Sequence, residues 1–150
     1  STKRSGSGLA TKDVRVRNVD ELLALPFPFA LSKSEAMQRL AAAAVPFSFS
    51  RMSGIQSFAN AVVLFINVEP HGGRYDNQST ATTVQWFAQA TQTLTAKPLV
   101  RILARSDDVL LLVKTPADGY KFCGRVEAIE HDATQRPIRF TLRLLDSTMP

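Results

Sequence analysis

The chain holds a single cysteine among its 150 residues, and it lacks the residue patterns that metal binding or nucleophilic catalysis requires. One cysteine excludes an internal disulfide framework, which suits a reducing compartment. His71 and His131 together with Cys123 give no metal-ligand spacing. Cys123 and His131 are eight residues apart, about 26 Å along a strand at about 3.3 Å per residue, which is too far for a nucleophile–base pair. We therefore expect no metal and no cofactor.

Signatures of phosphate-transferring, dinucleotide-binding or nuclease enzymes are also missing. The carboxylates Asp107, Asp108, Glu127 and Glu130 lack a lysine at nuclease-like spacing, so we expect them to form turns and surface charge. A small hydrolase or nuclease remains the last of three interpretations. The expectation for this chain is that it is not an enzyme.

Long hydrophobic runs are absent as well. The longest strongly apolar runs, 61–66 and 109–113, have the length of buried strands and fall far short of the roughly 20 residues that a membrane helix needs. A length of 150 residues with 45% hydrophobic content favours one domain with one core. We predict a disordered basic tail at 1–12, a single monomeric domain at 13–150, and no membrane association.

Positive charge exceeds negative charge, with 18 Lys and Arg against 13 Asp and Glu, for a net charge of +5. Most of this excess lies in residues 1–17, where five basic residues face Asp13 alone, so the remainder of the chain carries only +1. Such a tail is typical of a solvated chain end, with contact to nucleic acid or a targeting remnant as alternatives. The position of the charges therefore matters more than their sum.

Periodicity predicts an α+β fold with a mostly antiparallel, strongly bent sheet or small barrel and two or three short helices. The expected strands are 13–17, 47–49, 60–68, 82–89, 109–113, 120–130 and 138–145. The continuously apolar run 109–113 indicates a central strand covered on both faces. The expected helices are 18–25, the segment from the capping box Ser32-Lys33-Ser34-Glu35 towards Pro46, and 98–105.

Two of the expected strands place cations on one exposed face. In 138–145, apolar residues alternate with Arg139, Thr141 and Arg143, so the arginines should point outward. In 120–130, the same reasoning puts Lys121, Cys123 and Arg125 on one side. If the two strands pair, Lys121, Arg125, Arg139 and Arg143 share a face that could contact phosphates. The alternative is a solvated sheet face whose charges neutralise one another.

A second group of cations lies on the expected helix 98–105. Lys97, Arg101 and Arg105 recur at intervals of four and form a stripe opposite the apolar side. Such a stripe can bind phosphates, and an ordinary solvated helix face is the alternative.

Three further residues are candidates for reading bases. Trp86 and Tyr75 could stack on an unpaired base, and Gln89 could hydrogen-bond to adenine. For Trp86, packing in the core is the simpler expectation.

The order of motifs in about residues 83–146 resembles a known family. The motifs are Trp86-Phe87-Ala88-Gln89, the proline-containing segment 93–101, the strand 109–113, the segment 120–126 with Gly124, and His131 followed by Arg136-Pro137. Together they resemble an uncharacterised C-terminal domain of bacterial DNA helicase and nuclease fusion proteins, with relatives in eukaryotic DNA-associated proteins. Ala88-Gln89-Ala90 departs from a Ser-Gln-Asn-like segment of that family. The resemblance implies a DNA-linked accessory module and supplies no catalytic residues.

The sequence thus favours a non-catalytic module that binds nucleic acid, DNA in preference to RNA, within a larger intracellular protein. Its location would be nuclear in a eukaryote and cytoplasmic in a bacterium. The alternative is a protein interaction module in which phenylalanines near 26–29 or 47–49 dock a partner and the basic face is incidental.

Overall fold

A computed structural model describes residues 9–43, 47–50, 53–67, 82–115 and 119–149. The fold is α+β, with a six-stranded, mostly antiparallel open sheet and three α-helices in this part of the chain. The described structure begins at Leu9, four residues before the expected start of the domain. Leu9–Ala10 forms β1 and pairs with β2, Phe47–Ser48, in a separate two-stranded sheet, and Thr11–Asp13 forms a 3-10 turn.

The main sheet is built around β6, Asp108–Thr115, whose residues 109–113 are all buried. Leu110 and Leu112 pack into one apolar cluster, whereas Val109, Leu111 and Val113 pack into the other, so both faces are covered as the apolar run predicts. Beside β6 lies β4, Ala61–Asn67, in a parallel pairing within an otherwise antiparallel sheet. Short β3, Ile55–Ser57, pairs with β4 and was not expected as a strand.

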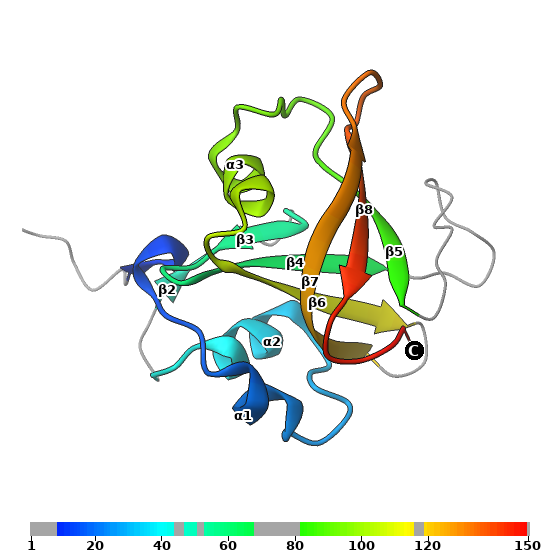
Figure 1. Cartoon of the computed structure of the whole chain (residues 1–150). Coiled ribbons are helices and arrows are strands. Elements are labelled where there is room, and N and C mark those ends of the chain that lie inside the picture. Colours follow the sequence, from blue (N-terminus) through cyan, green and yellow to red (C-terminus); the bar gives the residue numbers. More distant parts are fainter. Residues whose placement is uncertain (1–8, 44–46, 51–52, 68–81, 116–118, 150) are drawn as a thin grey trace, which may run out of the picture.

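The sheet bends because β7, Gly119–Asp132, belongs to both halves of it. Its first part pairs with β6 and its second part with β8, Arg139–Leu144, and β5, Thr83–Phe87, completes the order β3-β4-β6-β7-β8-β5. In Figure 1, β7, β8 and β5 stand steeply against β3, β4 and β6. Since β3 and β5 are separate edges, the sheet is strongly bent but does not close into a barrel.

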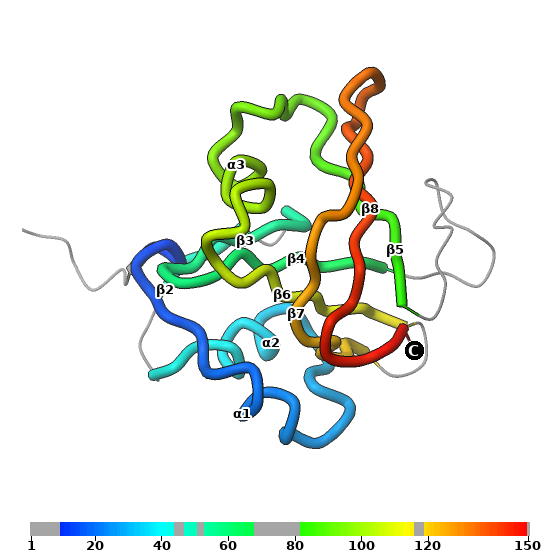
Figure 2. Tube along the Cα trace, in the orientation of Figure 1, coloured from blue at the N-terminus to red at the C-terminus, as the bar shows by residue number. Residues whose placement is uncertain are grey.

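Helices cover opposite faces of the sheet. The helices α1, Val19–Leu23, and α2, Lys33–Leu40, lie on one side of β4 and β6, and α3, Lys97–Ala104, lies on the other (Figure 2). Two apolar clusters result, one beneath α1 and α2 and the other beneath α3. Both clusters contain residues of the central strands β4 and β6. Packing on both faces therefore fixes these strands, and with them the loops and strand ends that carry charge.

The helix signals in the sequence are largely confirmed. The Ser32 side chain accepts a hydrogen bond from the Glu35 backbone N–H at 3.1 Å, as the capping box predicts. The helix α2 ends at Leu40, well before Pro46, because Ala41 turns to an extended conformation and forms an isolated bridge with Val16. That bridge also replaces the strand expected at 13–17. The helix α3 has Pro98 in its first turn and ends at Ala104, and the following residue, Arg105, caps it with a left-handed φ of 59°.

Candidate nucleic-acid interface

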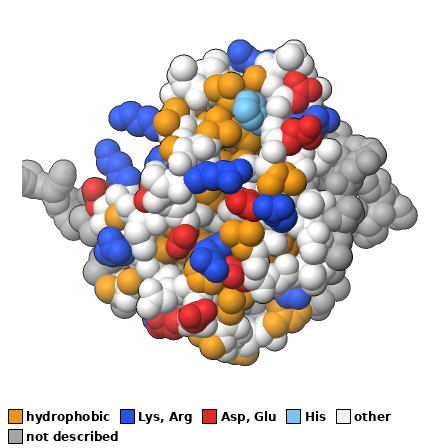
Figure 3. Space-filling view, in the orientation of Figure 1, with side chains coloured by type: hydrophobic (Ala, Val, Ile, Leu, Met, Phe, Trp, Pro, Cys, Tyr) orange, Lys and Arg blue, Asp and Glu red, His pale blue; other side chains and the backbone are white. Residues whose placement is uncertain are grey.

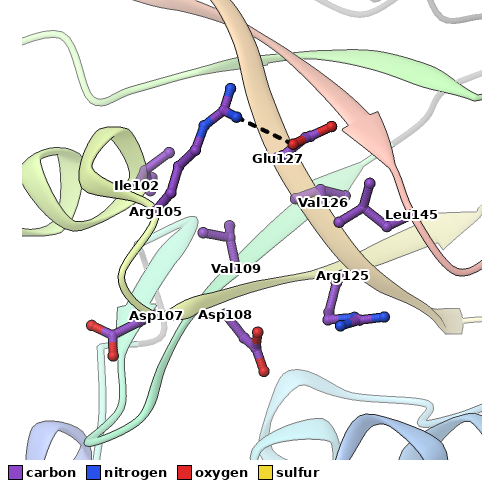
Figure 4. A pocket seen from close by; sticks show the side chains of 9 residues that line it. All are labelled: Ile102, Arg105, Asp107, Asp108, Val109, Arg125, Val126, Glu127 and Leu145. Carbon is purple, nitrogen blue, oxygen red and sulfur yellow. Dashed lines mark hydrogen bonds and ion pairs between the residues drawn. The ribbon is translucent and has the colours of Figure 1, made fainter.

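The cations of α3 are tied to neighbouring elements. Arg101 Nε donates to Asp107 Oδ2 at 2.9 Å, just beyond the helix. Arg105 Nη2 donates to the carbonyl oxygen of Ala128 on β7 at 2.6 Å, and its Nη1 lies 3.4 Å from Glu127 Oε1 (Figure 4). Lys97 is exposed at the start of the helix. The expected stripe therefore exists, but two of its three members already contact carboxylates.

On the sheet, strand pairing brings each arginine of β8 opposite an acid of β7. Arg143 is the register partner of Glu127, and its Nε donates to Glu127 Oε2 at 2.8 Å. Arg139 is the register partner of Asp132, with 4.0 Å between Arg139 Nη2 and Asp132 Oδ2. Arg139 Nε is buried without a hydrogen-bond partner in the described part of the chain. Cross-strand pairs of opposite charge thus occupy the part of the sheet where the sequence placed Arg139 and Arg143, as in the alternative of a face whose charges neutralise one another.

Arg125 makes the tightest pair on this surface. Its backbone N–H and Nε donate to Asp146 Oδ2 at 2.7 and 3.0 Å, and its Nη2 donates to Asp146 Oδ1 at 2.8 Å. The Arg125 side-chain hydrogen bonds, above all other influences, lower the pKa of Asp146, while Asp146 raises the pKa of Arg125. Gly124 makes this approach possible, because a Cβ at its φ of +82° would lie 2.7 Å from Asp146 Cβ.

The same glycine overturns the expected common face of Lys121 and Arg125. Simple alternation breaks at a β-bulge in β7, where the register with β6 shifts. Before the bulge, Lys121 pairs with Val113; after it, Arg125 pairs with Leu110, whose side chain enters the opposite apolar cluster. Lys121 and Arg125 therefore lie on opposite faces of the sheet. Cys123, expected on the exposed side, keeps the same face as Lys121 but is fully buried, because that face of β7 packs into the apolar cluster beneath α3.

We use the name arginine surface for Arg101, Arg105, Arg125, Arg139 and Arg143. All five form ion pairs with carboxylates, namely Asp107, Glu127, Asp132 and Asp146. Figure 3 shows the result as blue and red side chains lying next to one another across one side of the molecule. A hollow of about 180 Å³ opens between α3, β6 and β7, and Arg105, Asp107, Asp108, Arg125 and Glu127 contribute its charged lining (Figure 4).

The remaining predicted residues are placed differently. Lys121 Nζ lies 5.8 Å from the centre of the Phe27 ring. Trp86 is 6% exposed and packs against Phe140 with ring centres 5.6 Å apart, which matches the expectation of core packing rather than stacking on a base. Gln89 is exposed and donates from Nε2 to Ser53 Oγ at 3.3 Å. Tyr75 lies outside the described residues.

Groups that could perform catalysis do not gather in the described structure. Burial raises the pKa of the Cys123 thiol to about 11, which disfavours the nucleophilic thiolate. The His131 ring lies 5.9 Å from the Phe140 ring, while Cys123 is sealed in the core. Within 9–43, 47–50, 53–67, 82–115 and 119–149, no three metal-ligating side chains are grouped to hold an ion. In the same ranges, no helix has the length and apolar character to cross a membrane.

Sequence reasoning missed two parts of the charge arrangement. Asp146 lies just beyond β8, so only its three-dimensional contact with Arg125 reveals its role. The pairing of Glu127 with Arg143 could have been found from the strand register, since both residues were already placed on neighbouring strands. A group of lysines and aromatic residues beside α2 gave no local signal at all, because its members come from distant parts of the chain.

Comparison with known proteins identifies no family. No protein-family model and no curated protein matches the chain. Among solved structures, the crystal structure of Arabidopsis thaliana SUVH6 in complex with SAM is similar over 67% of this chain and 23% of that chain, with 14% sequence identity and a TM-score of 0.44. The chain thus spans less than a quarter of that protein's length, and likeness at this level carries no argument about function. The resemblance seen in residues 83–146 stays a prediction.

Proposed function

We propose that this domain is a non-catalytic module that binds nucleic acid, preferentially DNA, through the arginine surface. One observation carries the proposal: Arg105 and Arg143 share a single carboxylate, that of Glu127. This group of three side chains therefore has a surplus positive charge. It lies beside the hollow between α3 and β7, where a phosphate of a nucleic-acid backbone can approach.

Both guanidinium groups retain hydrogen-bonding capacity for such a phosphate. The Arg105 and Arg143 side chains are 55% and 53% exposed, and each guanidinium has five N–H donors, of which the contacts in the structure use only part. Exposed ion pairs contribute about 0–1 kcal/mol, so a phosphate can replace or join Glu127 at little cost. Arginine also matches phosphate geometry with two parallel hydrogen bonds. The existing pairs then serve to hold the arginines in place before binding.

The preference for DNA and the assignment to a larger DNA-associated protein rest on the resemblance of residues 83–146. An intracellular location, nuclear in a eukaryote and cytoplasmic in a bacterium, belongs to the same proposal. The basic residues at 1–12 would add attraction that does not depend on sequence. The separate contributions of tail and fold must therefore be measured.

The test is fluorescence-anisotropy titration of single-stranded and double-stranded DNA and RNA at two salt concentrations, with the full chain and with a chain lacking residues 1–8, which leaves β1 and its pairing with β2 in place. The decisive variant is Arg105→Ala/Arg143→Ala. We expect its DNA affinity at low salt to fall about tenfold. The dependence of log affinity on log salt should flatten by about 0.9 for each duplex phosphate that the variant no longer neutralises.

The matched control is Arg17→Ala/Arg39→Ala, which removes the same charge from two exposed ion pairs elsewhere on the molecule. Its affinity should stay within about twofold of the unmodified chain at equal salt, because only general attraction is reduced. Equal loss in both double variants would show that net charge alone drives binding. Binding that vanishes with residues 1–8, or is absent throughout, would overturn the proposal for the folded surface.

A protein interaction module is the second candidate, and exposed apolar side chains favour it. Phe27 and Leu31, in the connection between α1 and α2, are 52% and 69% exposed, and Leu23 nearby is 39% exposed. The other predicted docking segment fits less well, because Phe47 and Phe49 are partly buried and pack against the core. Affinity for such a partner would change little with salt, which separates it from nucleic-acid binding.

A further inference from the structure

A second, smaller hollow lies beside the first turn of α2, on the face of the sheet opposite α3. Its volume is about 140 Å³, and it is lined by Lys33 of α2, Ser53 and Gly54 before β3, Phe65 and Asn67 at the end of β4, and Tyr120 at the start of β7. We call this the lysine pocket. It shares no residue with the arginine surface, so a ligand bound in the pocket would be independent of the proposed function.

Lys33 is a partly buried cation that no carboxylate of the described residues balances. Its Nζ donates to the carbonyl oxygens of Ser50, at 3.0 Å, and Ser53, and lies 4.7 Å from the centre of the Phe65 ring. Across the described ranges, Lys33 forms no ion pair, and Glu35 of the same helix is engaged with Arg39 and with the Leu31 backbone N–H. Burial lowers the pKa of Lys33, as expected for an ammonium group with no compensating negative charge.

Beside Lys33, three residues paired across β4, β6 and β7 add positive charge and hydrogen-bond donors. Asn67, Lys114 and Tyr120 are partners on β4, β6 and β7, and therefore lie side by side on one face. Lys114 is exposed, and its Nζ lies 5.7 Å from the centre of the Tyr120 ring. Burial raises the pKa of the Tyr120 phenol, so it remains a hydrogen-bond donor at neutral pH. These three residues carry positive charge and donors but no acid.

The aromatic rings give the pocket a firm wall. Phe65 and Tyr120 meet edge to face, with ring centres 5.6 Å apart and planes at 85°. Lys33 lies over the Phe65 ring and Lys114 over the Tyr120 ring, so both ammonium groups are held on aromatic faces. The two cations flank this pair of rings, and neither forms an ion pair within the described residues, an arrangement that favours a bound anion.

We propose that the lysine pocket binds a phosphate monoester group, with Lys33 and Lys114 supplying the charge and Asn67 and Tyr120 supplying hydrogen bonds. The hollow of about 140 Å³ has room for a phosphate group with some hydration. A 5′-phosphate at the end of a nucleic-acid strand and a small organic phosphate both carry this group.

The experiment uses the full chain and titrates inorganic phosphate by calorimetry at constant ionic strength, with chloride as the replaced ion. We expect saturable binding in the unmodified protein. Lys33→Met keeps an unbranched apolar stem over Phe65 while removing the charge, and it should weaken binding at least tenfold. Lys97→Met, on α3, is the matched control and should bind as the unmodified chain does.

A second pair of variants guards against a purely structural effect of Lys33, which also ties α2 to Ser50 and Ser53. Lys114→Met and Tyr120→Phe leave those hydrogen bonds in place, and each should weaken phosphate binding several-fold while thermal unfolding stays unchanged. Absence of saturable binding in the unmodified chain would overturn the proposal. So would weaker binding in Lys33→Met alone, with Lys114→Met and Tyr120→Phe binding normally.

The source of the phosphate is resolved by two oligonucleotides that differ only in carrying a 5′-phosphate or a 5′-hydroxyl group. Tighter binding of the phosphorylated strand, with the difference abolished by Lys33→Met, assigns the pocket to strand ends. Equal binding of both strands, with inorganic phosphate still bound in the pocket, assigns it to a small organic phosphate.

Discussion

The arginine surface and the lysine pocket hold positive charge in opposite ways. Every arginine of the surface has a carboxylate within 4.0 Å, whereas Lys33 and Lys114 rest on carbonyl oxygens or aromatic rings. A planar guanidinium can donate two parallel hydrogen bonds to one carboxylate. A lysine ammonium is instead a compact charge on a flexible side chain. The region with more cations is therefore closer to neutral, and the region with fewer cations has the less balanced charge.

This difference shows that the number of basic residues on a strand does not measure the charge that a ligand can use. Glu127 partly neutralises the charge of Arg105 and Arg143. Asp146 accepts hydrogen bonds from three N–H groups of Arg125. On the arginine surface a ligand must compete with these acids. In the lysine pocket it would replace only water, carbonyl contacts and ring contacts. Substitutions that remove an acid, or the glycine that lets an acid approach, should therefore change the arginine surface and leave the lysine pocket as it is.

Replacing Gly124 by alanine should have the largest effect, because it disrupts the contact between Arg125 and Asp146 on the arginine surface. A Cβ at Gly124 would meet Asp146 Cβ at 2.7 Å in a backbone conformation with φ of +82°. We expect Gly124→Ala to lower the free energy of unfolding by about 1–3 kcal/mol, measured by urea denaturation. Gly54→Ala is the control, since its Cβ would meet only Phe65 O at 3.4 Å. Equal stability of the two variants would contradict this expectation.

Asp146→Asn removes the tightest pair while leaving the backbone unstrained. Arg125 lowers the pKa of Asp146 below its ordinary value of 3.8, so the ionised form stabilises the fold. That stabilisation is complete above pH 3.8 and is lost as the pH falls through the lower pKa of the folded state. Asp146→Asn should therefore cost about 1 kcal/mol at pH 7 and flatten the loss of stability below about pH 4, measured by urea denaturation across pH.

Asp108→Asn is the control for this pH dependence, because Asp108 lies in the same hollow but forms no ion pair within the described residues. Because Asp108 accepts none of the hydrogen bonds that Arg125 donates to Asp146, its replacement should change the loss of stability at low pH less than Asp146→Asn does. In Asp146→Asn, the free energy of unfolding should still fall somewhat as the pH is lowered, since hydrogen bonds from Thr134 also lower the pKa of Asp132. An unchanged slope in Asp146→Asn would show that Arg125 contributes nothing to folding.

Glu127→Gln tests whether carboxylates limit the arginine surface. The variant keeps an oxygen that can accept from Arg105 and Arg143 but removes the negative charge that they share. We expect DNA affinity to rise about threefold at low salt, with the gain fading as salt is raised. Glu21→Gln, which neutralises the partner of Arg17 on α1, should raise affinity less. Equal gains would mean that the two guanidinium groups have no special role.

The sequence alone was sufficient where a local pattern decides the structure. The apolar run of β6, the capping box at Ser32 and the alternation in β8 each produced the expected element, because burial and capping act over a few neighbouring residues. The outward direction of Arg139 and Arg143 also followed from alternation. Fold class could therefore be predicted before any tertiary contact was known.

Features set by tertiary contacts could not be predicted in the same way. The bulge at Gly124 moves Lys121 to the other face, and a glycine within a strand pattern does not by itself reveal the register shift. The acids opposite the arginines depend on which strands pair and in which register. The lysine pocket combines positions 33, 65, 67 and 120, with Lys114 beside the Tyr120 ring, and only the folded chain brings these positions together.

Cys123 reports whether the core below the arginine surface stays closed. Burial raises the pKa of its thiol from 9.0 to about 11, which leaves about a hundredfold less thiolate at pH 8. Alkylation by iodoacetamide should therefore be at least that much slower in the native chain than in urea, followed by mass spectrometry. Gly124→Ala should speed the native reaction, because it loosens the strand beside the thiol, whereas Lys33→Met should not. Rapid labelling of the unmodified native chain would mean that Cys123 is accessible and that the apolar cluster beneath α3 does not close over this face of β7.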